Sequence, residues 1–266
     1  MKSLTGAILL LSLIVFSLIV VSFCNRVQTR NQLIRQKVQH MRFRIDELEE
    51  ICASIEPLLE SVLIPKLINE EILDLIQSVK QLDPKATFVD LKLEHARALA
   101  EKLELEQRTQ PYYRVMASDT AIAKHKQYLT DAARVVRRHH FLGRIQNDEM
   151  ESYVRELSWA HLMVEVISHV VQGHKAVNRS DPVVAYGYYR RAQNVLIGAL
   201  QADERRHRMI RELSEILNGK RLALSTDLMP ETEFNPTQKP NFSGISGADL
   251  NQLDQLDPPD GEYKAS

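Results

Sequence analysis

The sequence predicts an all-α protein with a single N-terminal transmembrane helix, a coiled-coil-like stalk, a domain of helical hairpins and a disordered C-terminal tail. Three observations support this prediction. An uncharged apolar run extends from Ala7 to Phe23, and apolar residues recur at alternating steps of four and three from Ile34 to Val62. Helical periodicity then continues to about residue 221, and only 9 glycines and 10 prolines occur among the 266 residues.

Residues 1–24 are predicted to form a membrane anchor. As a helix, Leu4 to Cys24 is about 31 Å long, which matches a hydrocarbon core of roughly 30 Å. A cleaved signal peptide is the alternative, but its apolar stretch is shorter and ends at small residues. The bulky Phe23 before Cys24 also argues against a lipid-bearing cysteine. We therefore expect residues 4–24 to remain attached and to contact the lipid bilayer.

The charges on either side of this run predict its orientation. Only Lys2 precedes it, whereas Arg26, Arg30, Arg35 and Lys37 follow closely. The positive-inside rule then places the N-terminus outside and the C-terminal domain in the cytoplasm, at the inner (plasma) membrane. A second interpretation, compatible with the first, is that these basic residues solvate the stalk and touch lipid head groups.

Residues 25–65 are predicted to form the stalk. Val38 and Ile45 occupy a positions of a heptad pattern, and Met41, Leu48 and Ile55 occupy d positions. This seam is compatible with a parallel homodimer and equally with packing on the protein's own helices. Prolines at 57 and 65 are expected to bend or end the stalk helix.

Residues 66–221 are predicted to form an all-helical domain. Capping residues and prolines separate the expected helices, which run over 66–82, 87–106, 118–141, 147–175, 182–200 and 203–217. Residues 222–266 are expected to be a disordered tail, because residues 225–266 combine eight acidic residues and two lysines with few apolar ones.

Charge and cysteines exclude some classes of protein. The formal net charge of −1 does not suggest a nucleic-acid partner. Two cysteines, Cys24 and Cys52, form neither a CxxC motif nor a zinc-ligand spacing nor a disulfide framework. The chain is therefore expected to work in a reducing compartment without a cofactor.

One stretch, from Gly173 to Ala192, resembles a single tetratricopeptide-repeat (TPR) hairpin. Small residues at Gly173 and Ala176 precede a Ser180-Asp181 turn, and Ala185, Tyr189 and Ala192 follow it. The resemblance implies two antiparallel helices that approach closely at the small residues, with the tyrosine packed between them. It departs from the family where the repeat's tryptophan and leucine fall on His169 and Gln172. Both a degenerate helical array and an unrelated hairpin with the same spacing remain open.

Two groups of residues are candidates for binding a partner. Arg134, Arg137 and Arg138 share a helix face that suits phosphate, an acidic protein or the chain's own acidic tail, and a simply solvated face is the alternative. The second group lies on the expected helix 182–200 and is Tyr186, Tyr189 and Arg190, although helix packing also explains Tyr189.

A metal site is the alternative chemistry. His161, Glu165 and His169 recur every four residues on one helix face, and Glu204 with His207 forms one ExxH element without a second copy. The sequence contains neither a GxSxG elbow nor a glycine-rich phosphate loop. We therefore predict a membrane-anchored scaffold or adaptor that binds protein partners, rather than an enzyme. The competing hypothesis is a membrane-tethered metal-binding protein or enzyme that uses this histidine face.

Overall fold

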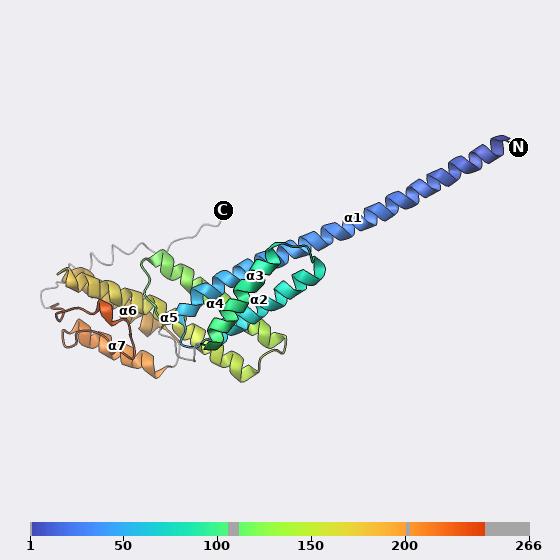
Figure 1. Ribbon diagram of the computed structural model, residues 1–266. Coiled ribbons are helices and arrows are strands. Elements are labelled where there is room, and N and C mark those ends of the chain that lie inside the picture. Colours follow the sequence, from blue (N-terminus) through green and yellow to red (C-terminus); the bar gives the residue numbers. More distant parts are fainter. Residues whose placement is uncertain (1, 106–111, 201–202, 243–266) are drawn as a thin grey trace. The chain divides into compact units, whose positions relative to one another are not determined.

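A computed structural model describes residues 2–105, 112–200 and 203–242, with the side chains of 2–16, 19, 20 and 105 outside the description. Over these residues the chain is helical and contains no strand, so the predicted all-α class is confirmed there (Figure 1). The α-helices are α1 Lys2–Ile55, α2 Leu63–Leu82, α3 Phe88–Leu105, α4 Asp119–Phe141, α5 Asn147–Asn178, α6 Pro182–Gly198 and α7 Glu204–Leu217. Two short 3-10 turns, η1 Glu56–Leu58 and η2 Thr232–Phe234, complete the described elements.

Side-chain caps begin several of these helices at the residues that the sequence indicated. The Ser118 Oγ atom accepts a hydrogen bond from the Ala121 amide at 3.2 Å and begins α4. Asp181 caps α6 in the same way through the Val184 amide at 3.2 Å. Local hydrogen bonding therefore explains why these helix starts were predictable.

The chain divides into two compact units. The first comprises Met1–Glu50 and Ile68–Lys102, and the second comprises Ile51–Leu67 and Leu103–Ser266. The first unit thus holds most of α1, α2 and α3, and the second holds α4 to α7.

Helix α1 is continuous from Lys2 to Ile55, so the expected anchor and stalk are parts of one helix. It ends where Pro57 enters the short turn η1, as the sequence indicated. Pro65 does not break a helix, because it lies in the first turn of α2, where a missing amide hydrogen has little effect. A short loop separates η1 from the start of α2 at Leu63.

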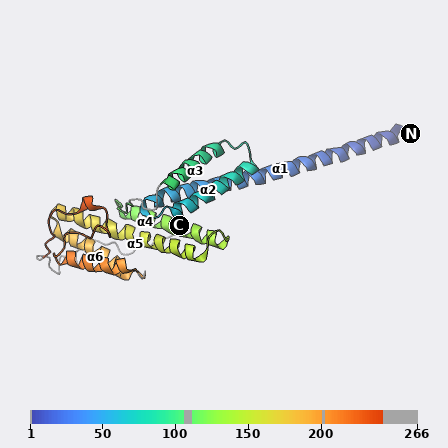
Figure 2. The same ribbon diagram turned by 60° about the horizontal axis from the view of Figure 1, so that its bottom comes forward.

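The heptad seam of α1 is covered by the chain itself. Its residues Val38, Ile45 and Leu48 are buried. In the first unit, α2 and α3 run beside α1 in both views (Figures 1 and 2). Ion pairs join α1 to each of them: Arg44 Nη2 lies 3.5 Å from the Glu71 carboxylate, and Lys92 Nζ lies 2.7 Å from that of Asp46. The sequence left open a parallel homodimer or packing on the chain's own helices, and in the structure the seam packs on the chain's own helices.

Most of the expected anchor has side chains outside the described residues. Of its members, Leu18, Val21 and Phe23 are described and exposed. Within the described part of the chain, no helix has a stretch that is both long and apolar enough to cross a bilayer.

The second unit has its core around α5. This helix packs against both α4 and α6, and α6 packs against α7. Trp159, Met163, Val170 and their neighbours on α5 form one buried cluster with residues of α6 and α7. Burial of this continuous apolar surface is the main stabilising contribution in the unit.

Residues 222–242, called the strap, correct the prediction of a tail disordered from residue 222. Leu224, Leu228 and Met229 of the strap are buried in the cluster of α5 to α7. Polar contacts hold it as well: Ser225 donates from its amide and its hydroxyl to the Glu212 carboxylate at 2.8 and 2.6 Å. The average hydropathy of this stretch is low, so the sequence did not indicate a packed segment. Three large apolar side chains within six residues nevertheless bury enough surface to hold it against the core. The remainder of the predicted tail, 243–266, lies outside the described residues.

Candidate functional site

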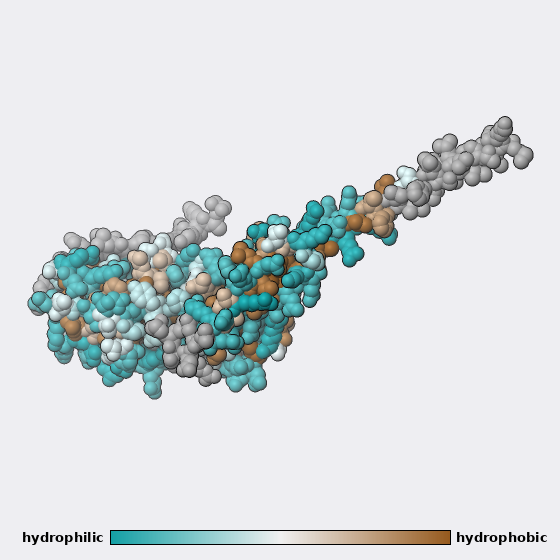
Figure 3. Space-filling model, in the orientation of Figure 1, coloured by the Kyte–Doolittle hydropathy of each residue, from teal (hydrophilic) through white to brown (hydrophobic). Residues whose placement is uncertain are grey.

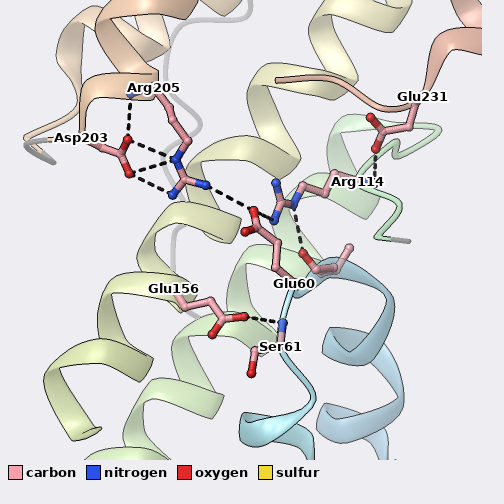
Figure 4. Close-up of polar contacts among 8 residues, drawn as sticks. Glu60, Ser61, Arg114, Glu156, Asp203, Arg205 and Glu231 are labelled. Carbon is pink, nitrogen blue, oxygen red and sulfur yellow. Dashed lines mark hydrogen bonds and ion pairs between the residues drawn. The ribbon is translucent and has the colours of Figure 1, made fainter. Parts of the chain in front are cut away.

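A network of charged side chains in the second unit is centred on Arg114, which follows α3 and is 2% exposed (Figure 4). Its Nε donates to the Leu58 carbonyl at 3.0 Å, and its Nη2 lies 3.2 Å from a carboxylate oxygen of Glu60. The backbone amide of Arg114 donates to Glu231 of the strap at 2.8 Å. Burial lowers the pKa of Arg114, and the neighbouring Glu60 opposes this shift. One residue thus connects η1, the segment before α4 and the strap.

A second arginine reaches the same carboxylate. The Glu60 oxygen that accepts from Arg114 also lies 3.3 Å from Nη1 of Arg205, in the first turn of α7. Arg205 pairs in addition with Asp203 at 2.9 Å, and its guanidinium lies 4.2 Å from the ring centroid of Trp159. Glu60 is therefore a bridge between two cationic groups from distant parts of the sequence.

A further acidic residue of the network, Glu156, contacts a backbone amide. Glu156 of α5 accepts a hydrogen bond from the Ser61 amide at 2.9 Å (Figure 4). Burial raises the pKa of Glu156, and the negative charge of Glu60 acts in the same direction. The second oxygen of Glu231 is buried, and none of the residues that the structure describes forms a hydrogen bond with it.

The contacts of this network point to a structural role for its two arginines. The hydrogen bonds and ion pairs of Arg114 and Arg205 are made to carboxylates and a carbonyl of the chain itself, so the two guanidinium groups are engaged in the folded unit. Of these charged groups only the Arg114 guanidinium is buried, and its contacts to Leu58 and Glu60 link it to the segment 58–60. We describe the network as a clamp that joins η1, α5, α7 and the strap.

The predicted basic face lies on the exposed side of α4. Arg134, Arg137 and Arg138 are exposed, while the opposite side of the helix is buried through residues such as Ala132 and Val136. Arg134 forms an ion pair with Asp131 one turn earlier. Among the described residues Arg137 has no ion-pair partner. The three arginines are thus brought together on a surface, as their spacing predicted.

The second predicted group on α6 is divided between surface and core. Tyr189 is 0% exposed, and burial raises its pKa well above the usual value. Tyr189 is therefore a packing residue, which removes it from the expected partner surface. Tyr186 is half-buried with its ring centroid 5.5 Å from that of Phe242, and Arg190 is exposed with Nη1 2.9 Å from the Gln193 amide oxygen.

The histidine face of α5 is occupied by protein contacts. The Glu165 carboxylate lies 2.5 Å from Lys126 Nζ, and His169 stacks on Tyr188 with 6.2 Å between ring centroids. Burial lowers the pKa of His161 and His169, with Lys126 and Arg191 as the next causes respectively. Within the described ranges no group of three His, Cys, Asp or Glu side chains is placed to hold a metal ion.

Several central residues were not indicated by the sequence. Arg114, Glu60 and Arg205 come from segments 54 to 145 positions apart, so no local pattern connects them. His174 is buried beside Tyr189, and neither of its ring nitrogens forms a hydrogen bond within the described part of the chain. In the sequence, only its position directly after Gly173 in an apolar part of α5 could have indicated that His174 is buried.

Comparisons of the chain with protein-family models, with curated proteins and with solved structures give no match.

Proposed function

We propose that this protein is a membrane-anchored helical scaffold whose second unit binds an acidic protein partner at the cytoplasmic surface of the inner membrane. The observation that carries the proposal is the continuity of α1. One helix extends from the apolar run of the sequence to residues buried among α2 and α3. An anchor joined to a folded domain without a flexible linker keeps that domain close to the bilayer and raises its effective concentration for partners there.

The basic face of α4 supports binding of an acidic partner. Arg134, Arg137 and Arg138 are exposed together, and arginine forms bidentate contacts with carboxylates. The clamp, by contrast, engages Arg114 and Arg205 within the fold. Exposed cationic groups are thus gathered on an outer face of the second unit, which suits recognition of another molecule.

A homodimer through the heptad seam is not part of this proposal. Val38, Ile45 and Leu48 are covered by the protein's own helices. Pairing of two copies through these residues would require α2 and α3 to leave α1. The partner surface is therefore assigned to α4, with Tyr186 and Arg190 of α6 as a second exposed or half-buried group.

Crosslinking in intact cells tests the partner surface. The full chain is crosslinked and purified in detergent, and attached peptides are identified by mass spectrometry. The test variant replaces Arg134, Arg137 and Arg138 with glutamine. A matched control removes the same charge from three exposed arginines elsewhere in the second unit, Arg155, Arg179 and Arg211. We expect crosslinks from α4 to an acidic protein that fall about tenfold in the test variant only. Equal crosslinking in all three proteins would contradict the proposal.

The anchor and its orientation are tested separately. Membranes washed with alkaline carbonate should retain the chain, and protease added to intact spheroplasts should leave the second unit undigested. Release by carbonate would overturn the anchor, whereas digestion from outside would reverse the orientation.

A further inference from the structure

Residues 1–45 contain no acidic side chain, although acidic residues are frequent in the rest of the chain. The first acid is Asp46, and Arg26, Arg30, Arg35 and Lys37 precede it directly after the apolar run. A segment with a single sign of charge is repelled by cations and attracts anions over a Debye length of about 10 Å.

The structure leaves these four basic side chains unengaged. Arg26, Arg30, Arg35 and Lys37 are exposed on α1, and the described residues provide none of them with an ion pair or hydrogen bond. Arg44, farther along the same helix, differs because it contacts Glu47 at 2.9 Å and Glu71 at 3.5 Å. Along the described part of α1 that follows the grey atoms in Figure 3, apolar patches are succeeded by hydrophilic side chains.

Helical geometry gives these residues a definite order. At 100° per residue, Arg26, Arg30 and Lys37 lie within about 40° of one another around the axis, and Arg35 is about 180° from Arg26. At 1.5 Å per residue, Arg26 and Arg30 are about 3 and 9 Å beyond Cys24 along the axis. Arg35 and Lys37 are about 17 and 20 Å beyond it.

We propose that Arg26 and Arg30 bind the phosphates of anionic phospholipids where α1 leaves the bilayer. This inference rests on the proposed function, because it requires the apolar run to end at the membrane surface. Arginine suits a lipid phosphate through its planar, bidentate donors. Arg35 and Lys37 lie beyond one Debye length and contribute less.

The graded positions distinguish a lipid surface from a soluble polyanion. A bilayer is a plane, so its attraction falls with distance along the helix and favours the two arginines nearest the apolar run. A soluble anion can approach either side of the helix, Arg35 on one side or Arg26, Arg30 and Lys37 on the other. Each cation would then contribute regardless of its distance from the apolar run. We call Arg26 and Arg30 the near pair and Arg35 and Lys37 the far pair. Comparing the effects of replacing each pair therefore distinguishes a lipid surface from a soluble anion.

The experiment uses the full chain reconstituted in vesicles of phosphatidylcholine. Spin-labelled phosphatidylglycerol or phosphatidylcholine is added, and electron paramagnetic resonance gives the relative association of the two lipids with the protein. The variants are R26Q/R30Q, R35Q/K37Q and a control, K85Q/R97Q, which removes two exposed basic residues of the same unit.

We expect the native chain to prefer phosphatidylglycerol, with about a fivefold loss per near arginine. R35Q/K37Q should lose less than half of the preference, and K85Q/R97Q none. Equal losses for the near and far pairs, or no preference in the native chain, would overturn the lipid site.

Vesicle flotation after a carbonate wash separates this inference from the proposed function. If the chain floats with the vesicles but shows no lipid preference, only the lipid site fails. If it does not float, the anchor fails, and the lipid site is overturned with it.

Discussion

The Cε1 atom of Tyr189 lies 2.6 Å from the point at which a Cβ atom would stand on Gly173. The Cδ1 atom of the same ring lies at 2.8 Å from that point. Helices α5 and α6 thus approach each other closely at Gly173, and the ring of Tyr189 fills the space that a side chain there would need. This contact holds the two helices of the hairpin together.

Replacement of Gly173 with alanine should destabilise the second unit. The new methyl group displaces a buried ring, which costs about 1–3 kcal/mol in a well-packed core. Urea unfolding of the full chain in detergent, followed by the fluorescence of Trp159, measures the change. Gly198→Ala is the matched control, because a Cβ atom added to Gly198 would meet no neighbouring segment within 4 Å. A Gly173→Ala protein as stable as the native chain would contradict the close approach.

Replacement of Arg114 with methionine should destabilise the clamp. Glu60 and the Leu58 carbonyl lose their contacts to a buried cation, and breaking a buried pair costs about 3 kcal/mol. The backbone amide of residue 114 can still donate to Glu231 of the strap. Arg205→Met should cost at most about 1 kcal/mol, because Arg205 contacts the same Glu60 but is substantially exposed. Urea unfolding of both variants gives the comparison. Equal losses would show that burial does not distinguish the two arginines.

Stability should decrease in acid because of His174. Burial lowers the pKa of His174 from 6.5 to about 4. The unfolded chain therefore binds this proton first, so stability is full above pH 6.5 and falls as pH decreases to 4. The loss over this window is about 3 kcal/mol.

Unfolding free energies at several pH values between 4 and 7 measure this slope. His174→Leu should flatten it, because leucine does not titrate and keeps the site apolar. The pKa values of His161 and His169 are also lowered, so part of the slope should remain in that variant. An unchanged slope in His174→Leu would contradict the assignment.

Truncation of Leu228 to alanine should loosen the strap. The side chain is buried in the cluster of α5 to α7, and loss of such a leucine costs about 2–4 kcal/mol. Hydrogen exchange should become faster in residues 222–242 before it changes in α4. The control is Leu200→Ala, since Leu200 is 99% exposed and its loss should change stability by less than about 0.5 kcal/mol.

Much of the helical fold was predictable because its signals are local. Ser118 and Asp181 cap the helices that they were expected to begin, and Pro57 ends α1. The strap was not predictable in this way. Its many polar residues lower the average hydropathy, and only three-dimensional packing shows that Leu224, Leu228 and Met229 share one core.

The candidate sites show the same division. The exposed face of Arg134, Arg137 and Arg138 follows from spacing on one helix, so the sequence alone indicated it. The contact of Arg114 with Glu60 joins residues 54 positions apart, and no periodic pattern encodes such a pair. Tyr189 was placed on a candidate surface, whereas its position opposite Gly173 makes it part of the interior.

The strap also determines when the second unit is completed during synthesis. The ribosome releases α5, α6 and α7 before the residues that cover them, so the apolar sides of Met209 and Leu213 stay open in the nascent chain. The core closes only after Met229 has emerged. The second unit therefore completes its core only at a late stage of synthesis, after most of the chain has left the ribosome.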